Sequence, residues 1–329
     1  MDHHNRILRF GAAVIAWSLV LRLYAAGTLE TVVTWLTQPN ITAFVTYLET
    51  GRYVRFSASQ GVFSEFAPES APPLRKPQDT KPVFSREDLV LTDIFYACDL
   101  RPDVESLLTA PLDWDLTDGK PAVLILHTHT TESYTQLHEN YVETSDYRTL
   151  DENYNMLSIG RQVAEILEEN GISVLQDRLL HDYPSYNGSY TDARRSIQAC
   201  LAENPTIRLI LDLHRDATDG ENGQLRTTAS IGGETSAQLM LVMGTNASGQ
   251  DHKNWEQNFS LALKLQAQLE RQSPGITRPT ILRAQRFNQD LSPGALLVEV
   301  GAAGNSHQEA LRAAEELAYA IVALSRGTG

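Results

Sequence analysis

Residues 123–129 read VLILHTH, four consecutive apolar residues that run directly into two histidines. An unbroken apolar run of this kind is typical of a strand buried on both faces, as in a parallel sheet covered by helices. Two later stretches have the same form, LILDLH at residues 209–214 and ALLVE at residues 295–299. The three stretches therefore predict buried strands that end in, or contain, a side chain able to bind a metal or carry a proton.

The segments around these strands have helical spacing. Residues 153–171 place Leu157, Val163 and Ile166 on one face, and Gly171 marks the end of that helix. Further helices are expected at residues 190–204, 258–271 and 307–326, and further strands at 172–177 and 237–244. Strands alternating with helices predict an α/β domain, a three-layer αβα sandwich with a largely parallel sheet. We place this domain at residues 88–329, with its first strand near Pro121.

The N-terminus carries a different signal. Residues 10–21 read FGAAVIAWSLVL, and Arg6 and Arg9 precede them, the order expected when the N-terminus stays in the cytoplasm. We predict a single transmembrane signal anchor at residues 1–27, with the α/β domain on the outer face of the cytoplasmic membrane. The run is short for a span of about 20 residues and Arg22 interrupts it, so a cleavable signal peptide is the alternative.

Residues 28–87 are expected to connect the anchor to the domain. Residues 28–50 carry apolar residues at mixed spacing, typical of short helices next to a membrane. Proline and charge then concentrate, as in APESAPPLRKPQDTKP at residues 67–82. Such a composition buries too little apolar surface to fold and behaves as an extended spacer. We therefore predict juxtamembrane helices followed by a proline-rich stalk.

Composition excludes several classes of protein. The net charge of the 329 residues is −14, which argues against nucleic acid as a partner because phosphates need a surface of lysine and arginine. Two cysteines, Cys98 and Cys200, are too few for a zinc ribbon or a disulfide scaffold. They fit either one bridge or two free thiols.

Side chains that carry chemistry lie at the ends of the three buried strands. His127, His129 and Glu132 follow the first strand, His214 ends the second, and Glu299 lies in the third. Ligands collect at the carboxyl ends of strands in open α/β sheets, so these groups are expected in one crevice. Two imidazoles and a carboxylate form the ligand set of a catalytic zinc, which leaves one position for water. A further carboxylate can then act as general base.

Each of these residues also has an ordinary structural explanation. A lone histidine at a strand end is usually a hydrogen-bonded loop residue, and Glu132 would suit the start of a following helix. Glu299 is more informative, because a carboxylate inside an apolar run needs a partner or a function. The coincidence at three strand ends favours a site over three separate structural roles.

Separated motifs, in order, resemble the stage II sporulation protein P family over roughly residues 88–325: HTHTTESY (127–134), DENYN (151–155), HDYPSYNGSY (181–190), DLHRDA (212–217), RFNQ (286–289) and LLVEVGAAGN (296–305). The last motif is also similar to the end of zinc-dependent N-acetylmuramoyl-L-alanine amidases. The resemblance implies a zinc enzyme that cleaves the amide bond between N-acetylmuramic acid and L-alanine in peptidoglycan, with endopeptidase activity on peptide cross-links, during engulfment in sporulation. It also implies two partners, stage II sporulation proteins D and M.

The resemblance implies a ligand set but leaves two choices open. His214 corresponds to the later histidine ligand of the amidases. For the first histidine we favour His129, which falls at the ligand position when the strands are aligned, over His127. For the carboxylate we favour Glu132, spaced from His129 as in zinc carboxypeptidases, over Glu152. Threonines flank His129 where the amidases have glycines, which is a departure from their pattern.

The resemblance and the strand pattern also suggest roles for the neighbouring residues. Glu299 is expected to take a proton from water and return it to the leaving amine. Asp212, on the same strand face as His214, would orient that imidazole, with Asp216 as the alternative. Two arginines, Arg215 and Arg286, are expected either to bind substrate carboxylates or to form ordinary salt bridges. Three tyrosines, Tyr183, Tyr186 and Tyr190, are expected either to line a substrate groove or to pack in the domain.

Two other functions fit parts of the sequence. The pair His127 and His129 after a buried strand also opens metal-dependent amidohydrolase barrels, but those need eight strand–helix units of typically about 250 residues. An anchored, non-catalytic wall-binding module of the same fold is the second alternative. The presence of both His214 and Glu299 argues against that module.

Overall fold

The computed structural model describes residues 81–112, 114–136, 143–145, 147–220 and 223–325. These residues belong to one compact unit that runs from Lys76 to Gly329. The predicted anchor at residues 1–27 and nearly all of the predicted stalk lie outside the described residues. Within the described ranges, no helix is both long and apolar enough to cross a membrane.

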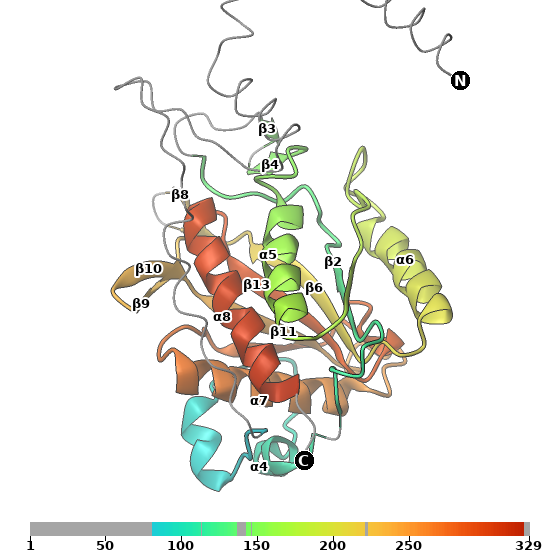
Figure 1. The fold of residues 1–329 in the computed structure, drawn as a ribbon, viewed down its shortest axis with the longest axis vertical. Coiled ribbons are helices and arrows are strands. Elements are labelled where there is room, and N and C mark those ends of the chain that lie inside the picture. The colour runs from blue at the N-terminus through green and yellow to red at the C-terminus, as the bar shows by residue number, and fades with distance from the viewer. Residues whose placement is uncertain (1–80, 113, 137–142, 146, 221–222, 326–329) are drawn as a thin grey trace, which may run out of the picture. The chain divides into compact units, whose positions relative to one another are not determined.

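A seven-stranded sheet forms the centre of the unit (Figure 1). Its strands, in spatial order, are β1 (Ile94–Ala97), β12 (Thr280–Arg283), β11 (Leu239–Gly244), β13 (Ala295–Ala302), β6 (Leu209–Asp216), β2 (Val123–Leu126) and β5 (Val174–Gln176). Every neighbouring pair is parallel except β11 and β13, which are antiparallel. The predicted α/β class with a largely parallel sheet is confirmed.

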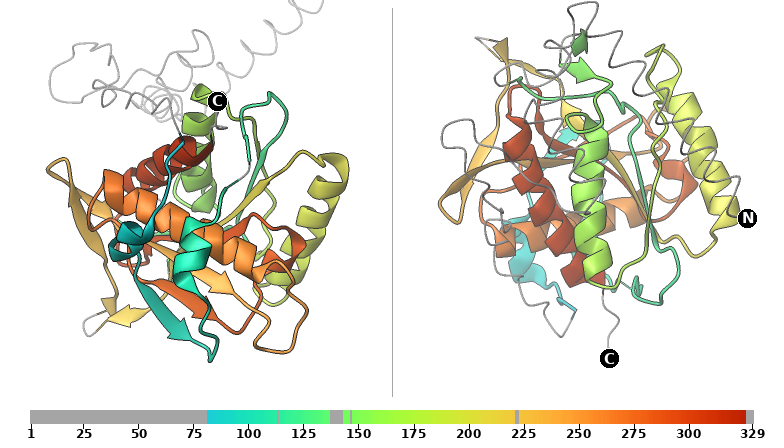
Figure 2. Two further views of the ribbon diagram at one scale, coloured as in Figure 1. Left: turned by 90° about the horizontal axis from the view of Figure 1, so that it is seen from below. Right: turned by 45° about the horizontal axis from the view of Figure 1, so that its top comes forward.

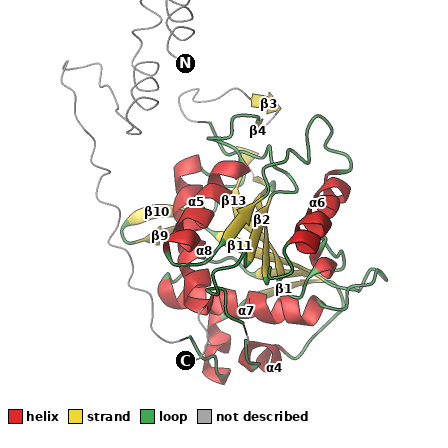
Figure 3. Cartoon of the chain, turned by 45° about the vertical axis from the view of Figure 1, so that its right-hand side comes forward, coloured by secondary structure: helices red, strands yellow, loops and turns green. Residues whose placement is uncertain are grey.

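Helices cover both faces of the sheet unequally (Figures 2 and 3). Three of them pack on one face: α5 (Met156–Glu169), α7 (Trp255–Gln272) and α8 (His307–Ser325). The other face carries α6 (Ser189–Glu203), which packs on alternate residues of the same strands. Leu124 and Leu126 of β2 contact α6, whereas Val123 and Ile125 belong to the larger core. The expected three layers are present, with α6 as the one long helix of the thinner layer in the described part of the chain.

Several elements carry too weak a signal to be predicted from the sequence. The edge strand β1 has four residues, two of them exposed, and β12 is equally short. Other short elements are η1 (Arg86–Leu91), α4 (Val104–Thr109), η2 (Gln289–Leu291), and the strand pairs β3 (Glu143–Ser145) with β4 (Arg148–Thr149), β7 (Asp219–Gly220) with β8 (Gly223–Gln224), and β9 (Thr228–Ile231) with β10 (Glu234–Ala237). Cys98 and Cys200 are not bonded to each other. Of the two alternatives, one disulfide bridge or two free thiols, the structure contains the second.

The folded part begins before the predicted boundary at residue 88, and its first strand precedes Pro121. Phe84 is 7% exposed and belongs to the main core, with the guanidinium of Arg271 4.6 Å from its ring centroid. The last residues assigned to the stalk are therefore part of the domain. A single phenylalanine in a polar, proline-rich stretch has no periodicity that would reveal its burial.

Gly160 lets α5 lie close to the end of β2. A methyl group at this position would come within 2.4 Å of Nε2 of Gln176 and 2.6 Å of Nε2 of His127. Neither neighbour is free to move, because Gln176 donates to the carbonyl of Leu157 (3.0 Å) and Nδ1 of His127 lies 3.2 Å from the carbonyl oxygen of Leu213. The glycine thus provides the space that these two side chains occupy.

We expect Gly160→Ala to lower the free energy of unfolding by up to about 2 kcal/mol, measured by urea denaturation. Overpacking costs about 1–3 kcal/mol and outweighs the gain in helix propensity of about 1 kcal/mol. Adding Gln176→Ala removes the closer of the two contacts and should restore part of the loss. A single variant as stable as the unsubstituted chain would contradict this account of the packing.

Lys264 of α7 is a buried amine, 2% exposed. Its Nζ donates to the carbonyl of Leu107 (2.6 Å) and to the hydroxyl of Ser260 (2.8 Å), both neutral groups. Burial lowers the pKa of Lys264 to about 8. Below pH 8 the amine is charged in both the folded and the unfolded chain, and folding then bears the full cost of burying that charge. Between pH 8 and about 10.4 only the unfolded chain binds the proton, so this cost falls as the pH rises.

Lys264→Met should therefore raise the free energy of unfolding at pH 7, by about 1–3 kcal/mol, with the gain lost by pH 10. The carbonyl of Leu107 keeps a partner, because the hydroxyl of Ser260 also donates to it (2.6 Å). The measurement is urea denaturation at both pH values, with Lys253→Met, at an 84% exposed side chain, as the matched control. Lower stability of Lys264→Met than of the unsubstituted chain at pH 7 would show this interpretation to be wrong.

Candidate active site

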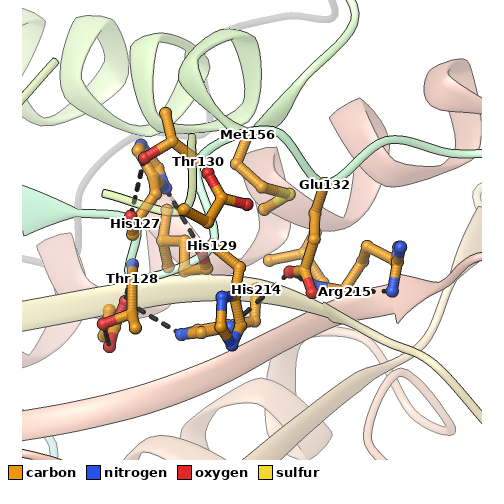
Figure 4. A network of polar contacts seen from close by, with 12 residues as sticks. His127, Thr128, His129, Thr130, Glu132, Met156, His214 and Arg215 are labelled. Carbon is orange, nitrogen blue, oxygen red and sulfur yellow. Dashed lines mark hydrogen bonds and ion pairs between the residues drawn. The ribbon is translucent and has the colours of Figure 1, made fainter. Parts of the chain in front are cut away.

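The carboxyl ends of β2, β6 and β13 meet at one edge of the sheet. Strand β6 lies between the other two, pairing in parallel with both. Its register with β13 sets His214 opposite Glu299, and its register with β2 sets Asp212 opposite Leu126. The chain leaves β2 at Leu126 and turns, so that residues 127–132 pass over the end of β6 (Figure 4). The three predicted strand ends are thus neighbours in space.

His129 is the histidine of this turn that faces His214. The centroids of their rings are 5.3 Å apart and the ring planes are nearly perpendicular, at 87°. Nε2 of His129 lies 3.1 Å from the hydroxyl oxygen of Tyr186. Its Nδ1 is buried and has no hydrogen-bond partner among the described residues. A buried nitrogen without a partner costs free energy, and such atoms are common where a protein binds an ion or substrate.

His127 is a core residue, 1% exposed. Its Nδ1 lies 3.2 Å from the carbonyl oxygen of Leu213 and its Nε2 lies 3.3 Å from Nε2 of Gln176. A neutral ring satisfies both contacts by donating from Nδ1 and accepting at Nε2. Burial lowers the pKa of His127 to about 4, which favours this neutral form. In the structure, therefore, the ring of His129 contacts the ring of His214, whereas the ring of His127 is held by Leu213 and Gln176.

His214 lies between two carboxylates. Its Nε2 is 2.9 Å from Oδ1 of Asp212, an ion pair that lacks the geometry of a hydrogen bond, and its Nδ1 is 3.6 Å from Oε2 of Glu132. Asp212 is itself fixed by Thr128, whose backbone nitrogen (2.8 Å) and hydroxyl (2.6 Å) donate to it. Burial favours neutral His214, but Asp212 and Glu132 outweigh burial and raise its pKa well above the ordinary value. Asp212 thus occupies the place expected of the residue that orients His214.

Glu132 is 4% exposed and surrounded by positive charge. Its carboxylate lies 3.5 Å from Nη1 of Arg215 and 3.4 Å from Nη2 of Arg148, and it accepts from the backbone nitrogen of Arg215 at 3.3 Å. Burial opposes ionisation, but Arg215 and His214 outweigh it and hold the pKa of Glu132 well below its ordinary value. Glu152, the alternative, is exposed, pairs with Arg178 and lies outside this cluster.

Glu299 completes the cluster from the third strand. Its side chain is half-buried, and its Oε2 has no hydrogen-bond partner within the described part of the chain. Burial raises the pKa of Glu299 to about 8, with Glu132 and Asp216 adding to the rise and His214 opposing it. A carboxyl group with a pKa near neutrality is able both to accept and to return a proton.

Comparison with known proteins agrees with the sequence motifs of residues 127–305. Residues 68–322 match the sequence profile of the family described as Stage II sporulation protein P. The chain belongs to the stage II sporulation protein P family. The curated member from Bacillus subtilis (strain 168), "Stage II sporulation protein P", is 31% identical over 213 residues, which are 61% of this chain and 50% of that protein. The chain thus matches about half the length of that relative.

Among solved structures, those that the chain matches include two bacterial amidases. One is N-acetylmuramoyl-L-alanine amidase AmiC2 of Nostoc punctiforme, 15% identical with a TM-score of 0.36, covering 62% of this chain and 94% of that chain. The other is the CwlD amidase from Clostridioides difficile in complex with the GerS lipoprotein, 14% identical with a TM-score of 0.40, covering 61% of this chain and 94% of that chain.

In this stage II sporulation protein P family member, the contacts of Arg215 and Asp216 indicate structural roles. Arg215 is 4% exposed, and it donates to the carbonyls of Ser133 (3.0 Å) and Tyr147 (3.1 Å) besides balancing Glu132. Asp216 pairs with Arg278 at 2.7 Å, and its influence on the cluster is electrostatic. Arg286 lies outside the cluster, on the loop after β12, 3.5 Å from Asp290.

Two further residues of this family member belong to the site, although the sequence alone assigns neither of them a specific role there. Tyr186, in the motif HDYPSYNGSY, stacks on His129 with ring centroids 4.5 Å apart. The guanidinium of Arg148 lies over the ring of Tyr186, 4.9 Å from its centroid. It also pairs with two carboxylates, Glu132 at 3.4 Å and Asp182 at 2.6 Å. The motif marks Tyr186 as a groove or packing residue, whereas nothing in the local sequence marks Arg148 as a counter-charge.

Proposed function

We propose that this protein is a zinc-dependent peptidoglycan hydrolase that acts in sporulation and cleaves the amide bond between N-acetylmuramic acid and L-alanine. The observation that carries the proposal is the meeting of His129, His214 and Glu299 from three strand ends, with a buried, unpartnered nitrogen on His129 within the described structure. Membership of the stage II sporulation protein P family supports the setting in sporulation.

The residues present fit a zinc ion in the type and number of their donors. His129, His214 and ionised Glu132 offer two nitrogens and one carboxylate, the set that leaves one position open in a catalytic zinc site. In the described residues, as they lie, no group of three His, Cys, Asp or Glu side chains is arranged to hold a metal. Zinc binding would therefore require side chains of this set to rotate; in the structure Nδ1 of His214 and Oε2 of Glu132 lie 3.6 Å apart. A bound zinc ion would supply Lewis acidity that polarises a carbonyl group and activates water.

The other groups of the site have distinct tasks in this proposal. Glu299 accepts a proton as the water oxygen bonds to the scissile carbonyl carbon, and it returns that proton to the alanine nitrogen as the carbon–nitrogen bond breaks. Asp212, fixed by Thr128, keeps His214 oriented. Arg215 and His214 keep Glu132 ionised in a buried position by lowering its pKa.

The remaining parts of the proposal depend on the sequence pattern and on the family. We propose that an anchor at residues 1–27 and a connecting stalk that ends before Phe84 hold the catalytic part on the outer face of the cytoplasmic membrane. Endopeptidase activity on peptide cross-links, and partnership with stage II sporulation proteins D and M, complete the proposed function. Isolation of the full chain from membranes with these two proteins attached would support the partnership.

Digestion of purified peptidoglycan by the full chain tests the reaction itself. With zinc present, we expect stem peptides that carry a free N-terminal alanine, identified by mass, and no release after the metal is chelated. Separated cross-linked stems alone would indicate an endopeptidase without amidase activity. Binding to the wall polymer without any soluble product would favour the non-catalytic wall-binding module.

A further inference from the structure

A cavity of about 360 Å³ lies beside the candidate active site. Its walls come from the start of α6, the loop after β11 and the loop after β12, and include Tyr190, Arg194, Gln250, Arg286 and Phe287. Tyr190 borders both the cavity and the site. Its ring centroid is 5.6 Å from that of His129 and 6.5 Å from that of His214, and it is 6.1 Å from that of Phe287. A molecule in the cavity would therefore adjoin the proposed catalytic groups.

The loop that forms one wall has an unusual backbone. Phe287 and Asn288 have φ angles of 51° and 59°. Two consecutive non-glycine residues in the left-handed region are uncommon and persist only where the surroundings hold them, often at binding sites. Here the side chain of Asn288 donates to the carbonyl of Tyr190 at 2.7 Å. The strained loop is thus tied directly to Tyr190, the residue that borders both the cavity and the site.

A second set of contacts fixes the loop to the end of β11. The side chain of Gln289 donates to the carbonyl of Val242 and accepts from the backbone nitrogen of Gly244, both at 2.8 Å. Gly244 is also required for the close approach, because a methyl group there would lie 2.4 Å from the carbonyl oxygen of Gln285. The cavity wall is therefore built in advance of any ligand, which reduces the entropy lost on binding.

The charges around the cavity favour an anion. Arg194 makes two contacts with Asp290, at 2.9 and 2.7 Å, so these two charges offset each other. Arg286 has a longer contact of 3.5 Å with the same carboxylate and keeps other guanidinium donors available. Two guanidinium groups thus face one carboxylate in a chain whose net charge is −14. Arginine binds carboxylates through its planar fork, and the aromatic rings of Tyr190 and Phe287 suit less polar parts of a ligand.

We propose that this cavity binds the stem peptide of the substrate, with Arg286 holding one of its carboxylates and Tyr190 and Phe287 packing against its backbone. The proposal rests on the proposed function and adds a substrate subsite to it. Arg286 is then a specificity residue, which discriminates a free carboxylate from an amide, while the bond to be cut lies at the cluster of His129, His214 and Glu299.

Kinetics of the full chain on two synthetic muropeptides, one with free stem carboxylates and one with all of them amidated, test the subsite. Arg286→Gln should raise KM for the free-carboxylate substrate by about 10- to 100-fold, the worth of a charge-assisted contact, with little change in kcat. It should leave KM for the amidated substrate unchanged. Arg286→Lys keeps the charge and should recover part of the loss. Arg283→Gln removes an exposed charge three residues away and should behave like the unsubstituted chain.

The outcomes separate the subsite from the reaction. If the unsubstituted chain cleaves both muropeptides and Arg286→Gln affects them equally or not at all, the subsite is wrong and the proposed function stands. If the unsubstituted chain cleaves neither, the proposed function fails. Calorimetry with the free stem peptide then still tests the cavity, because binding should weaken by the same factor in Arg286→Gln. Binding that is absent, or equal in both chains, would overturn the subsite.

Discussion

Replacing Glu299 with glutamine should lower peptidoglycan turnover by about 10³-fold, within the range that a general acid–base group contributes. Glutamine has nearly the same shape as glutamate but cannot accept the proton of the attacking water. The fold and the zinc content should be retained, because Glu299 lies outside the proposed ligand set and has an unpartnered oxygen in the described structure. Release of stem peptides, thermal unfolding and bound zinc are measured on the same preparation.

Glu152→Gln is the matched control for this prediction. It makes the same chemical change on an exposed carboxylate that pairs with Arg178 and lies away from the cluster. We expect nearly normal turnover from this variant. Turnover by Glu299→Gln within a few-fold of normal would remove Glu299 as the general base, and loss of zinc from Glu152→Gln would move the carboxylate ligand to that residue.

His129→Asn and His214→Asn should each reduce bound zinc to background and abolish turnover. Changing a residue that only orients a ligand typically costs about 10- to 100-fold in metal affinity, and loss of a ligand should cost more. Asp212→Asn, by the same principle, should weaken zinc binding by about 10- to 100-fold, since it holds His214 without joining the proposed ligand set. Zinc per chain is measured by elemental analysis after dialysis against a fixed free-zinc concentration.

His127→Asn is the control that decides between the two histidines of the turn. His127 makes its contacts with Leu213 and Gln176 in the interior, so its loss should lower stability and leave zinc in place. Zinc retained by His129→Asn and lost from His127→Asn would reverse the assignment.

The sheet and the general position of the site were predictable because a simple periodicity encodes them. Strands β2, β6 and β13 each begin with an apolar run of three or four residues, and parallel strands bring their carboxyl ends to one edge. Strand β1 was missed because half of its four residues are exposed, and Phe84 because a single buried side chain has no period. The apolar runs at the starts of these strands therefore predicted which segments meet.

The individual residues of the site were harder to predict, because they lie where the regular structure ends. Strand β2 stops at Leu126, so strand alternation no longer fixes the directions of His127 and His129. Their directions depend on Gly160 and Gln176 for one ring and on Tyr186 for the other, all of them remote in sequence. The choice between Glu132 and Glu152 likewise depends on Arg148 and Arg215, which only the folded chain brings to one carboxylate.

The central claim is that His129, Glu132 and His214 share one metal ion at the edge of the sheet, next to Glu299. Anomalous diffraction at the zinc absorption edge, from crystals of the full chain grown with zinc, tests it most directly. We predict a single strong peak about 2.0–2.2 Å from a nitrogen of each histidine and from an oxygen of Glu132. A peak at any other group of side chains, or no peak at this edge of the sheet in a chain that cleaves peptidoglycan, would contradict the account.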